Sequence, residues 1–212
     1  MAEPRFSEVI KVLDGVFFNL PLHASRMART ASCFGYPAPP LDLPRIPDNL
    51  GCGLVKCRLV YGRDIESVEF SRYSFRKINN LALANGDELD YAHKSTDRRA
   101  LADLVAAAGA DEVLIVKNGL ITDTSFSNVV FDDGQGRLTT PRQPLLAGVK
   151  RETLLRRGLI REAEISPADL PGFRAVYLIN AMTDLEDRLS PPLPAVEGIY
   201  LHRDRPAGII SP

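Results

Sequence analysis

The chain has 212 residues, of which 45% are apolar and 25% are charged, and its formal net charge is −1. This length and composition predict a soluble globular protein with one large domain or two small ones. Lys and Arg residues are interspersed with Asp and Glu, so we expect no nucleic-acid partner and no binding to an anionic membrane.

Targeting and metal-binding signals are weak. The first residues, Met-Ala-Glu-Pro-Arg-Phe-Ser-Glu, lack the apolar core of a signal peptide, and no apolar run is long enough to span a bilayer. Cys33, Cys52 and Cys57 form no Cys-x-x-Cys pair, which favours reduced thiols in a cytoplasmic protein. The three histidines have no metal-ligand spacing, so no metal site is expected.

The first half of the chain predicts short strands around one helix. Asp14-Gly15 is a hairpin signal between strands at residues 8–13 and 16–20. We expect the helix to be capped by Asn19 and to end at Gly35. A proline-rich loop over residues 35–53 and strands at 54–61 and 67–75 complete this half.

Residues 81–89 lose the strand pattern and contain Asn85-Gly86, which indicates a boundary between two halves. We therefore predict a small N-terminal domain over residues 1–82, a connector over 83–91 and a larger domain over 92–212.

The second half predicts a more regular alternation of elements. Apolar residues at 101, 104, 105 and 108 lie on one face of a helix over residues 97–108. The further expected elements are strands at 112–116, 120–122, 127–131, 137–140, 159–165 and 175–179, a helix at 149–157 and a helical turn at 167–170. Such a mixture predicts an α+β fold. Glycine motifs of dinucleotide and P-loop sites are absent from the sequence.

Two residues carry potential chemistry near predicted element ends. Lys94 precedes a helix expected to start near Thr96, whose positive end disfavours the ammonium form and favours a nucleophilic amine. Asp123 follows a strand among small hydroxyl residues, where a carboxylate is suited to bind a protonated ring nitrogen. On local sequence alone, a solvated surface Lys and a turn Asp are the commoner explanations.

Two further features predict anion binding. Gly148, Val149 and Lys150 open a helix, where backbone N–H groups bind anions and the glycine allows a close approach. Arg26 provides a guanidinium that can bind phosphate oxygens in a bidentate manner. An ordinary helix start and a surface charge are again the commoner explanations of these residues taken singly.

Taken in order, these features resemble the class IV aminotransferases, which are pyridoxal-phosphate enzymes of fold type IV, from about Phe6 to Asp184. The matching segments are Leu-His-Ala-Ser-Arg-Met at 22–27, Lys-Ser-Thr-Asp-Arg at 94–98, Val-Lys-Asn-Gly-Leu-Ile-Thr-Asp-Thr-Ser-Phe-Ser-Asn-Val-Val-Phe at 116–131, Thr-Pro at 140–141 with Leu-Leu-Ala-Gly-Val-Lys-Arg at 145–151, and Leu-Ile-Asn-Ala-Met at 178–182. The resemblance implies a two-domain fold like that of D-amino-acid aminotransferase, with a shortened small N-terminal domain.

The resemblance also implies a role for each candidate residue. Lys94 is the implied Schiff-base lysine of pyridoxal 5′-phosphate, and Asp123 is the implied partner of its pyridine nitrogen. Arg26 and the helix start are the implied phosphate site. The last cofactor-side loop contains Asn180 and Ala181. In the family, Glu is usual at the position of Asp123, and Thr is frequent at those of Lys150 and Ala181.

The implied activity is transfer of an amino group between an amino acid and a 2-oxo acid, in a homodimer. Two alternatives remain open: a 4-amino-4-deoxychorismate lyase that releases pyruvate, and a non-catalytic protein that keeps the fold. Arg58, Arg72 and Arg98 are candidate carboxylate binders, and His93 is expected to be structural.

Overall fold

A computed structural model describes residues 3–194 of the chain as two compact units. The N-terminal unit combines Met1–Phe75 with His93–Asp97, and the C-terminal unit combines Arg76–Ala92 with Arg98–Pro212. The units therefore divide differently from the predicted 1–82, 83–91 and 92–212, because residues 76–92 pair and pack with the C-terminal unit. The predicted surface tail from Pro191 onward lies mostly outside the described residues.

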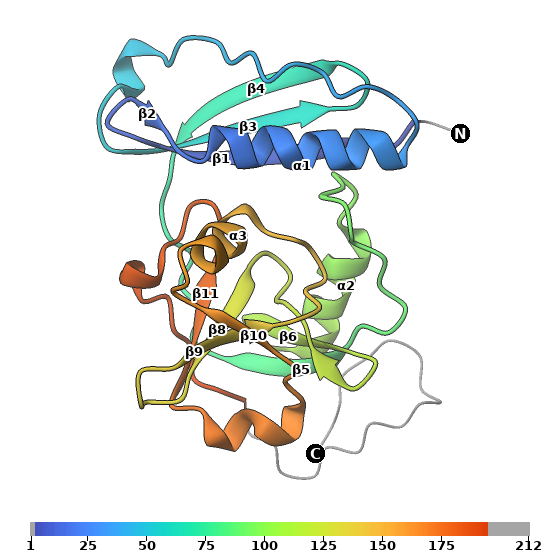
Figure 1. The fold of residues 1–212 in the computed structure, drawn as a ribbon, viewed down its shortest axis with the longest axis vertical. Helices are drawn as coiled ribbons and strands as arrows, with labels where there is room; N and C mark the ends of the chain where they lie inside the picture. The colour runs from blue at the N-terminus through green and yellow to red at the C-terminus, as the bar shows by residue number, and fades with distance from the viewer. Residues whose placement is uncertain (1–2, 195–212) are drawn as a thin grey trace. The chain divides into compact units, whose positions relative to one another are not determined.

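The N-terminal unit is a four-stranded antiparallel sheet with one long helix (Figure 1). Its elements are β1 (Phe6–Leu13), β2 (Val16–Phe17), α1 (Leu20–Cys33), the 3-10 turn η1 (Asp48–Leu50), β3 (Leu54–Tyr61) and β4 (Ile65–Arg72). The strand order is β2-β1-β3-β4. The predicted hairpin is confirmed, since Asp14 and Gly15 have φ values of 48° and 80°, as a two-residue turn requires.

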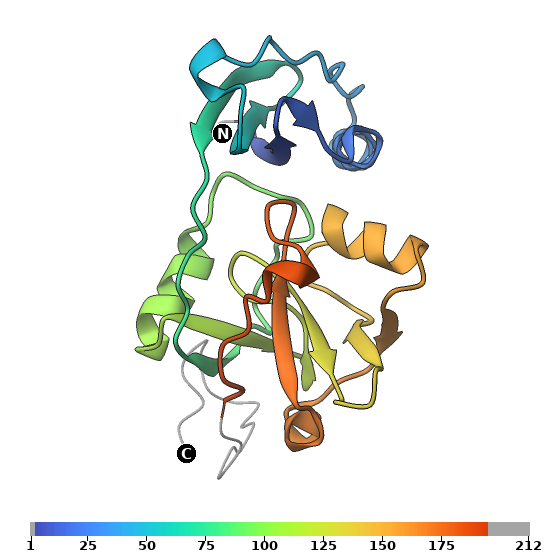
Figure 2. The same cartoon turned by 90° about the vertical axis from the view of Figure 1, so that its left-hand side faces the viewer.

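Helix α1 starts differently from the prediction. Asn19 precedes it with a left-handed backbone and makes no side-chain cap bond. Its main-chain oxygen accepts hydrogen bonds from the N–H groups of Leu22 and His23 instead. One face of α1 lies along the sheet (Figures 1 and 2), where Met27 packs in the buried cluster of Phe6, Leu59 and Tyr61. The helix is thereby fixed against β1 and β3.

The C-terminal unit contains two small sheets and two helices (Figure 2). Its elements are β5 (Leu81–Asn85), α2 (Arg99–Ala108), β6 (Glu112–Lys117), β7 (Leu120–Ile121), β8 (Asn128–Asp132), β9 (Leu138–Pro141), α3 (Val149–Arg156), β10 (Arg161–Ala163), η2 (Pro167–Gly172), β11 (Ala175–Ile179) and η3 (Leu185–Asp187). One sheet has the order β5-β6-β7 and the other β10-β9-β8-β11. The fold is α+β.

Strand β5 corrects the prediction that residues 81–89 lose the strand pattern. Residues 81–85 pair in parallel with residues 112–116 of β6. A Cβ on Gly86, directly after β5, would lie 2.4 Å from Cγ2 of Ile115. Residues 81–86 are thus a packed strand and turn of the C-terminal unit.

The core of the C-terminal unit lies between its two sheets. Its largest cluster joins Leu81 and Leu83 of β5 and Leu114 and Val116 of β6 with buried residues of β8 and β11. A second cluster contains Leu101 and Leu104 of α2, which confirms the predicted apolar helix face. These contacts fix β6, β8 and the loop that joins β7 to β8.

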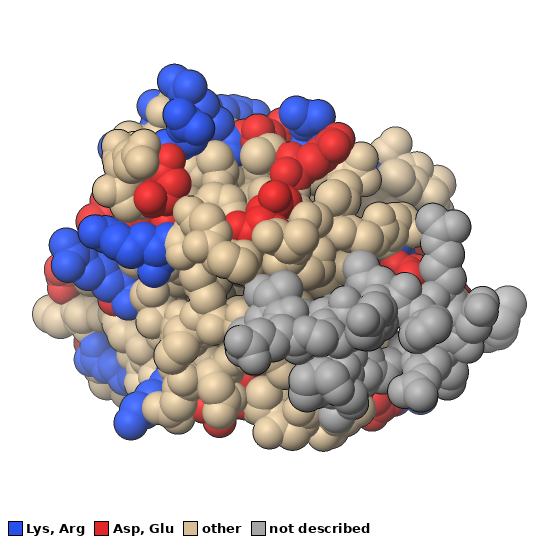
Figure 3. Space-filling model, turned by 90° about the horizontal axis from the view of Figure 1, so that it is seen from below, with Lys and Arg blue, Asp and Glu red and all other residues tan. Residues whose placement is uncertain are grey.

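One face of the described part of the chain has a mixed charge distribution. Lys and Arg side chains occur in small groups beside Asp and Glu on the face shown in Figure 3. Within residues 3–194, no helix has the length and apolar character needed to cross a membrane. The same residues contain no group of three or more His, Cys, Asp or Glu side chains arranged to bind a metal ion.

Candidate active-site residues

Lys94 lies in a short segment that extends the N-terminal sheet. Its main-chain oxygen accepts a hydrogen bond of 2.9 Å from the N–H of Ser7, and the N–H of Thr96 donates one of 2.9 Å to the oxygen of Arg5. These bonds place residues 94–96 beside the first residues of β1. The Lys94 side chain is partly buried. The prediction that a helix starts near Thr96 is wrong, because α2 begins at Arg99. Since the effect of the helix dipole is confined to the first helical turn, it does not reach Lys94 as predicted.

Arg26 belongs to a buried charged cluster in the same unit. Its Nε and Nη2 donate hydrogen bonds of 2.8 and 2.5 Å to the two carboxylate oxygens of Glu8. The Nδ1 of His23 lies 2.6 Å from the second of these oxygens. Burial raises the pKa of Glu8, but the charge of Arg26 and the hydrogen bonds from both partners lower it to about 2. The cluster therefore holds the Arg26 guanidinium in one orientation.

Glu8 is not among the residues that the sequence patterns singled out. A signal was present, because Glu8 occupies an inward position of β1 between Phe6 and Ile10, which are both buried. A carboxylate at such a position needs a buried partner. His23 and Arg26, three residues apart on one face of α1, provide it.

Asp123 is a fully buried carboxylate in the C-terminal unit. Its Oδ1 accepts a hydrogen bond of 2.8 Å from Nδ2 of Asn128, and its Oδ2 accepts one of 2.8 Å from the N–H of Leu146. Burial raises its pKa to about 7, although the hydrogen bonds from Asn128 and from the main chain at Leu145 and Leu146, and the charge of Arg151, act in the opposite direction. Within residues 3–194 the hydrogen-bond donors to this carboxylate are neutral groups, and Arg151 acts on it through its charge alone.

The turn before α3 is attached to the same carboxylate. Asn128 also donates a hydrogen bond of 2.9 Å to the main-chain oxygen of Leu146. Gly148 is the residue before α3, and a Cβ there would lie only 1.8 Å from Oδ1 of Asn128. The next two residues, Val149 and Lys150, are buried. The predicted helix start is confirmed, and it lies against the side chain that holds Asp123.

The loop with Asn180 and Ala181 is linked to α3 through Asp184, a residue that no sequence pattern indicated. The ammonium group of Lys150 donates to Oδ1 of Asp184 in a partly buried ion pair. Asn180 accepts the N–H of Met182 at 2.8 Å within its own loop. Oγ1 of Thr183 is buried without a hydrogen-bond partner. The C-terminal unit thus joins Asp123, the start of α3 and the loop of residues 180–184 through direct contacts.

Of the other candidate residues, Arg72, Arg98 and His93 make contacts within their own units. Arg72 donates to the main-chain oxygens of Asn49 and Cys52, and Arg98 donates to that of Ser125 at 2.7 Å. The ring of His93 packs against those of Phe6 and Phe34. The contacts of Arg72 and Arg98 favour a role in holding loops.

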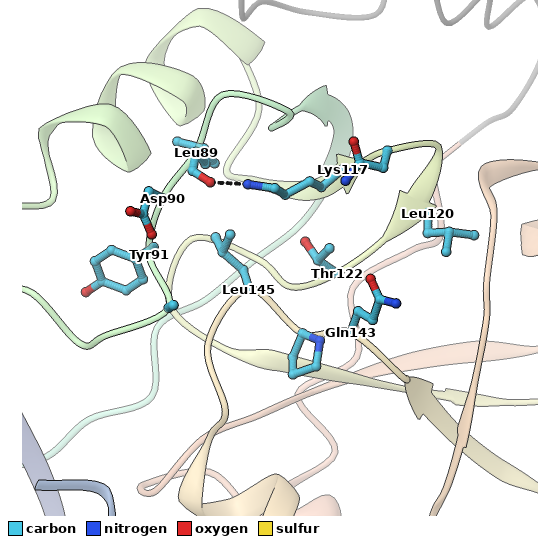
Figure 4. Close-up of a pocket in the computed structure, with 11 residues that line it drawn as sticks. Leu89, Asp90, Tyr91, Lys117, Leu120, Thr122, Gln143 and Leu145 are labelled. Atoms are coloured by element: carbon cyan, nitrogen blue, oxygen red, sulfur yellow. Dashed lines mark hydrogen bonds between the residues drawn. The ribbon is translucent and has the colours of Figure 1, made fainter. Parts of the chain in front are cut away.

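A pocket of about 230 Å³ lies in the C-terminal unit (Figure 4). Lys117 at the end of β6 reaches across it and donates to the main-chain oxygen of Leu89. Its other lining residues include Tyr91, Thr122 and Gln143, and none of the predicted site residues. The pocket therefore adjoins the Asp123 cluster through Thr122 and Leu145 without including Asp123 itself.

The sequence as a whole matches a known family. Residues 6–185 match the family described as amino-transferase class IV. The chain belongs to the class IV aminotransferase family. The cofactor of this family is pyridoxal 5′-phosphate.

Individual relatives agree with this assignment. The chain is 32% identical over 184 residues to an uncharacterized protein of Haemophilus influenzae, which covers 84% of this chain and 97% of the relative. A solved structure from Haemophilus somnus, provisionally assigned as a 4-amino-4-deoxychorismate lyase, has 27% identity and a TM-score of 0.73, covering 86% of this chain and 98% of that one. A structure from Mesorhizobium loti, provisionally assigned as an amino-acid aminotransferase, has 25% identity and a TM-score of 0.67, with coverages of 84% and 95%.

The residues of this chain fit the cofactor at one position, the buried carboxylate of Asp123. Asp123 is a buried carboxylate whose hydrogen-bond donors are neutral, and burying an uncompensated charge is costly. A protonated pyridine nitrogen would supply a positive charge hydrogen-bonded to the carboxylate, whereas Arg151 acts on it through its charge alone. The Asp123 site is therefore suited to a cationic ring, as the cofactor requires.

Proposed function

We propose that the protein is a pyridoxal-phosphate-dependent aminotransferase that moves an amino group between an amino acid and a 2-oxo acid. The observation that carries the proposal is Asp123, because a buried carboxylate without a cationic donor matches a protonated ring nitrogen. Family membership supports the cofactor, and the M. loti structure supports the reaction class by its assignment. We further propose that the protein acts in the cytoplasm as a homodimer.

Each predicted site residue has one task in this proposal. Lys94 would hold the cofactor covalently, and its amine, once released, would accept and return the α-proton of the substrate. Asp123 would keep the ring nitrogen protonated. When bound, pyridoxal phosphate supplies an electron sink that stabilises the carbanion formed by loss of that proton.

The remaining site residues bind or orient. Arg26, whose guanidinium is oriented by Glu8, would bind phosphate oxygens. The backbone N–H groups of Val149 and Lys150, with Gly148 before them, would add donors at a helix start. Asn180 and Ala181 would line the cofactor from their loop.

A second candidate is a lyase that releases pyruvate from 4-amino-4-deoxychorismate. It is favoured by the H. somnus structure, whose provisional assignment names that activity. Lys94 and Asp123 would have the same tasks in both reactions. The two differ in whether an amino donor alone converts the bound cofactor to its amine form.

The test begins with the absorption spectrum of purified protein plus pyridoxal phosphate. We expect a band that borohydride fixes and a modified peptide that contains Lys94, identified by mass spectrometry. Lys94→Ala should lose both signals, whereas Lys77→Ala, a change at an exposed lysine, should keep them. Failure of the wild type to bind the cofactor at high concentration would reject the proposal and leave a non-catalytic protein with this fold.

The second stage separates the reactions. Bleaching of the band by one amino acid, followed by its recovery with a 2-oxo acid, would identify an aminotransferase and its donor. Pyruvate release from 4-amino-4-deoxychorismate without any acceptor, with a band that amino acids leave unchanged, would identify the lyase. The oligomeric state can be measured by analytical ultracentrifugation on the same sample.

A further inference from the structure

Asn128 uses its whole side-chain amide within the C-terminal unit. It is the first residue of β8 and is 5% exposed. One N–H of its Nδ2 group donates to Asp123 and the other to the main-chain oxygen of Leu146, over 2.8 and 2.9 Å. An amide nitrogen has two hydrogens, so both donors are used.

The acceptor end of the same side chain is equally constrained. Its Oδ1 occupies the space that a Cβ of residue 148 would need, which only glycine leaves open. Asn128 therefore touches the carboxylate of Asp123, the main chain of the turn at Leu146 and the residue before α3. The carboxylate and the helix start cannot move independently of this one side chain.

We propose that Asn128 is a positioning residue that sets the Asp123 carboxylate and the turn at residues 146–148 in one fixed arrangement, so that ring nitrogen and phosphate are bound together. This inference rests on the proposed cofactor role of Asp123 and Gly148. The chemistry of the side chain is specific. Asn128→Asp would replace two donors by a second buried acid, and Asn128→Leu would leave both acceptors without partners.

The first test uses the cofactor-free protein. The carboxyl carbon of Asp123 is titrated by NMR in the wild type, in Asn128→Asp and in Asn128→Ser, with Asp123→Asn used to assign the signal. We expect the pKa of Asp123 to rise above about 7 in both variants, because a donor that stabilises the charged form is lost. Asn79→Ala is the matched control, since Asn79 donates to Asp111 through the same pair of groups on the exposed surface. Removal of the Asn79 side chain should leave the pKa of Asp123 unchanged.

The second test measures pyridoxal-phosphate affinity from pH 5 to pH 9 by titration of the absorption band. We expect both Asn128 variants to bind about tenfold to a hundredfold more weakly than the wild type at neutral pH, and Asn79→Ala to bind normally. The affinity of the variants should also begin to fall at a higher pH as the solution is acidified. A merely structural residue would not move that pH profile.

The outcomes separate this inference from the function on which it rests. The role of Asn128 would be overturned if the titration of Asp123 is the same in the variants as in the wild type. It would also be overturned if the wild type binds the cofactor tightly and the Asn128 variants bind it equally well. Either result would leave the proposed function intact. A wild type that binds no cofactor would overturn both. If Asn128→Asp does not fold, Asn128→Ser and Gly148→Ala, which displaces the same side chain, give the measurement.

Discussion

The buried carboxylate of Asp123 predicts an unusual dependence of stability on pH. Its pKa rises from 3.8 to about 7 on folding, because burial disfavours the charged form. The unfolded chain therefore loses this proton at a lower pH than the folded chain does. Between about pH 4 and pH 7 the folded state binds more protons, so this group makes the cofactor-free protein less stable as the pH rises.

The size of the effect follows from the same pKa difference. About three pKa units, at roughly 1.4 kcal/mol for each unit, correspond to about 4 kcal/mol lost from the C-terminal unit by pH 8. Asp123→Asn cannot ionise and should lack this loss. The amide offers one acceptor oxygen for two donors, at Asn128 and Leu146, so it should cost about 1–3 kcal/mol at every pH. The variant should be less stable than the wild type at pH 4.5 and more stable at pH 8.

Urea unfolding of both proteins without cofactor, followed by circular dichroism from pH 4.5 to pH 8, measures this difference. Hydrogen exchange of the amides of β6 and β8 reports the C-terminal unit alone. All other titrating groups are shared, so the difference between the two curves isolates Asp123. If the unfolding free energies of the two proteins change with pH in parallel, folding does not raise the pKa of Asp123. That result would remove the reason for assigning this carboxylate a cationic partner.

Two further substitutions test the packing described above. Glu8→Gln should destabilise the N-terminal unit by about 3–5 kcal/mol above pH 4.5, because it leaves a buried guanidinium without its anion. This difference should shrink as the wild type is acidified toward pH 2, because Glu8 itself then becomes protonated. Glu3→Gln, in an exposed ion pair, should change the urea midpoint far less, and equal losses would contradict the buried-pair explanation. Gly86→Ala should cost about 1–3 kcal/mol by overpacking against Ile115, measured by thermal unfolding. The added Cβ of Gly172→Ala would meet no atom within 4 Å. A loss of stability equal to that of Gly86→Ala would therefore refute the steric explanation.

Features with local causes could be predicted from the sequence. Asp14-Gly15 forms the expected turn, with positive φ at both residues, because such a turn depends on a few neighbouring atoms. The strand Ala175–Ile179 has the predicted limits, and α2 has the predicted buried face. In each case the decisive pattern lies within about ten residues of sequence.

Features with distant causes could not be predicted in this way. β5 is a strand because it pairs with β6, whose residues lie about 30 positions later, and Ala and Asn favour strands weakly. The local sequence makes Asp123 a candidate, but a turn Asp is the commoner explanation until the resemblance to class IV aminotransferases is considered. Asp184 carried no local signal, since its partner Lys150 lies on another element. Pairing across the chain decides these positions.

The five-residue segment His93–Asp97 has a consequence for biosynthesis. The N-terminal sheet receives this segment only after the chain has continued through Arg76–Ala92, which belong to the other unit. During translation the first unit therefore stays incomplete until residue 97 has left the ribosome. A fragment that stops at residue 75 should expose the edge of β1 near Phe6, and unpaired strand edges promote aggregation. Neither unit can be expressed whole as one uninterrupted stretch of this chain.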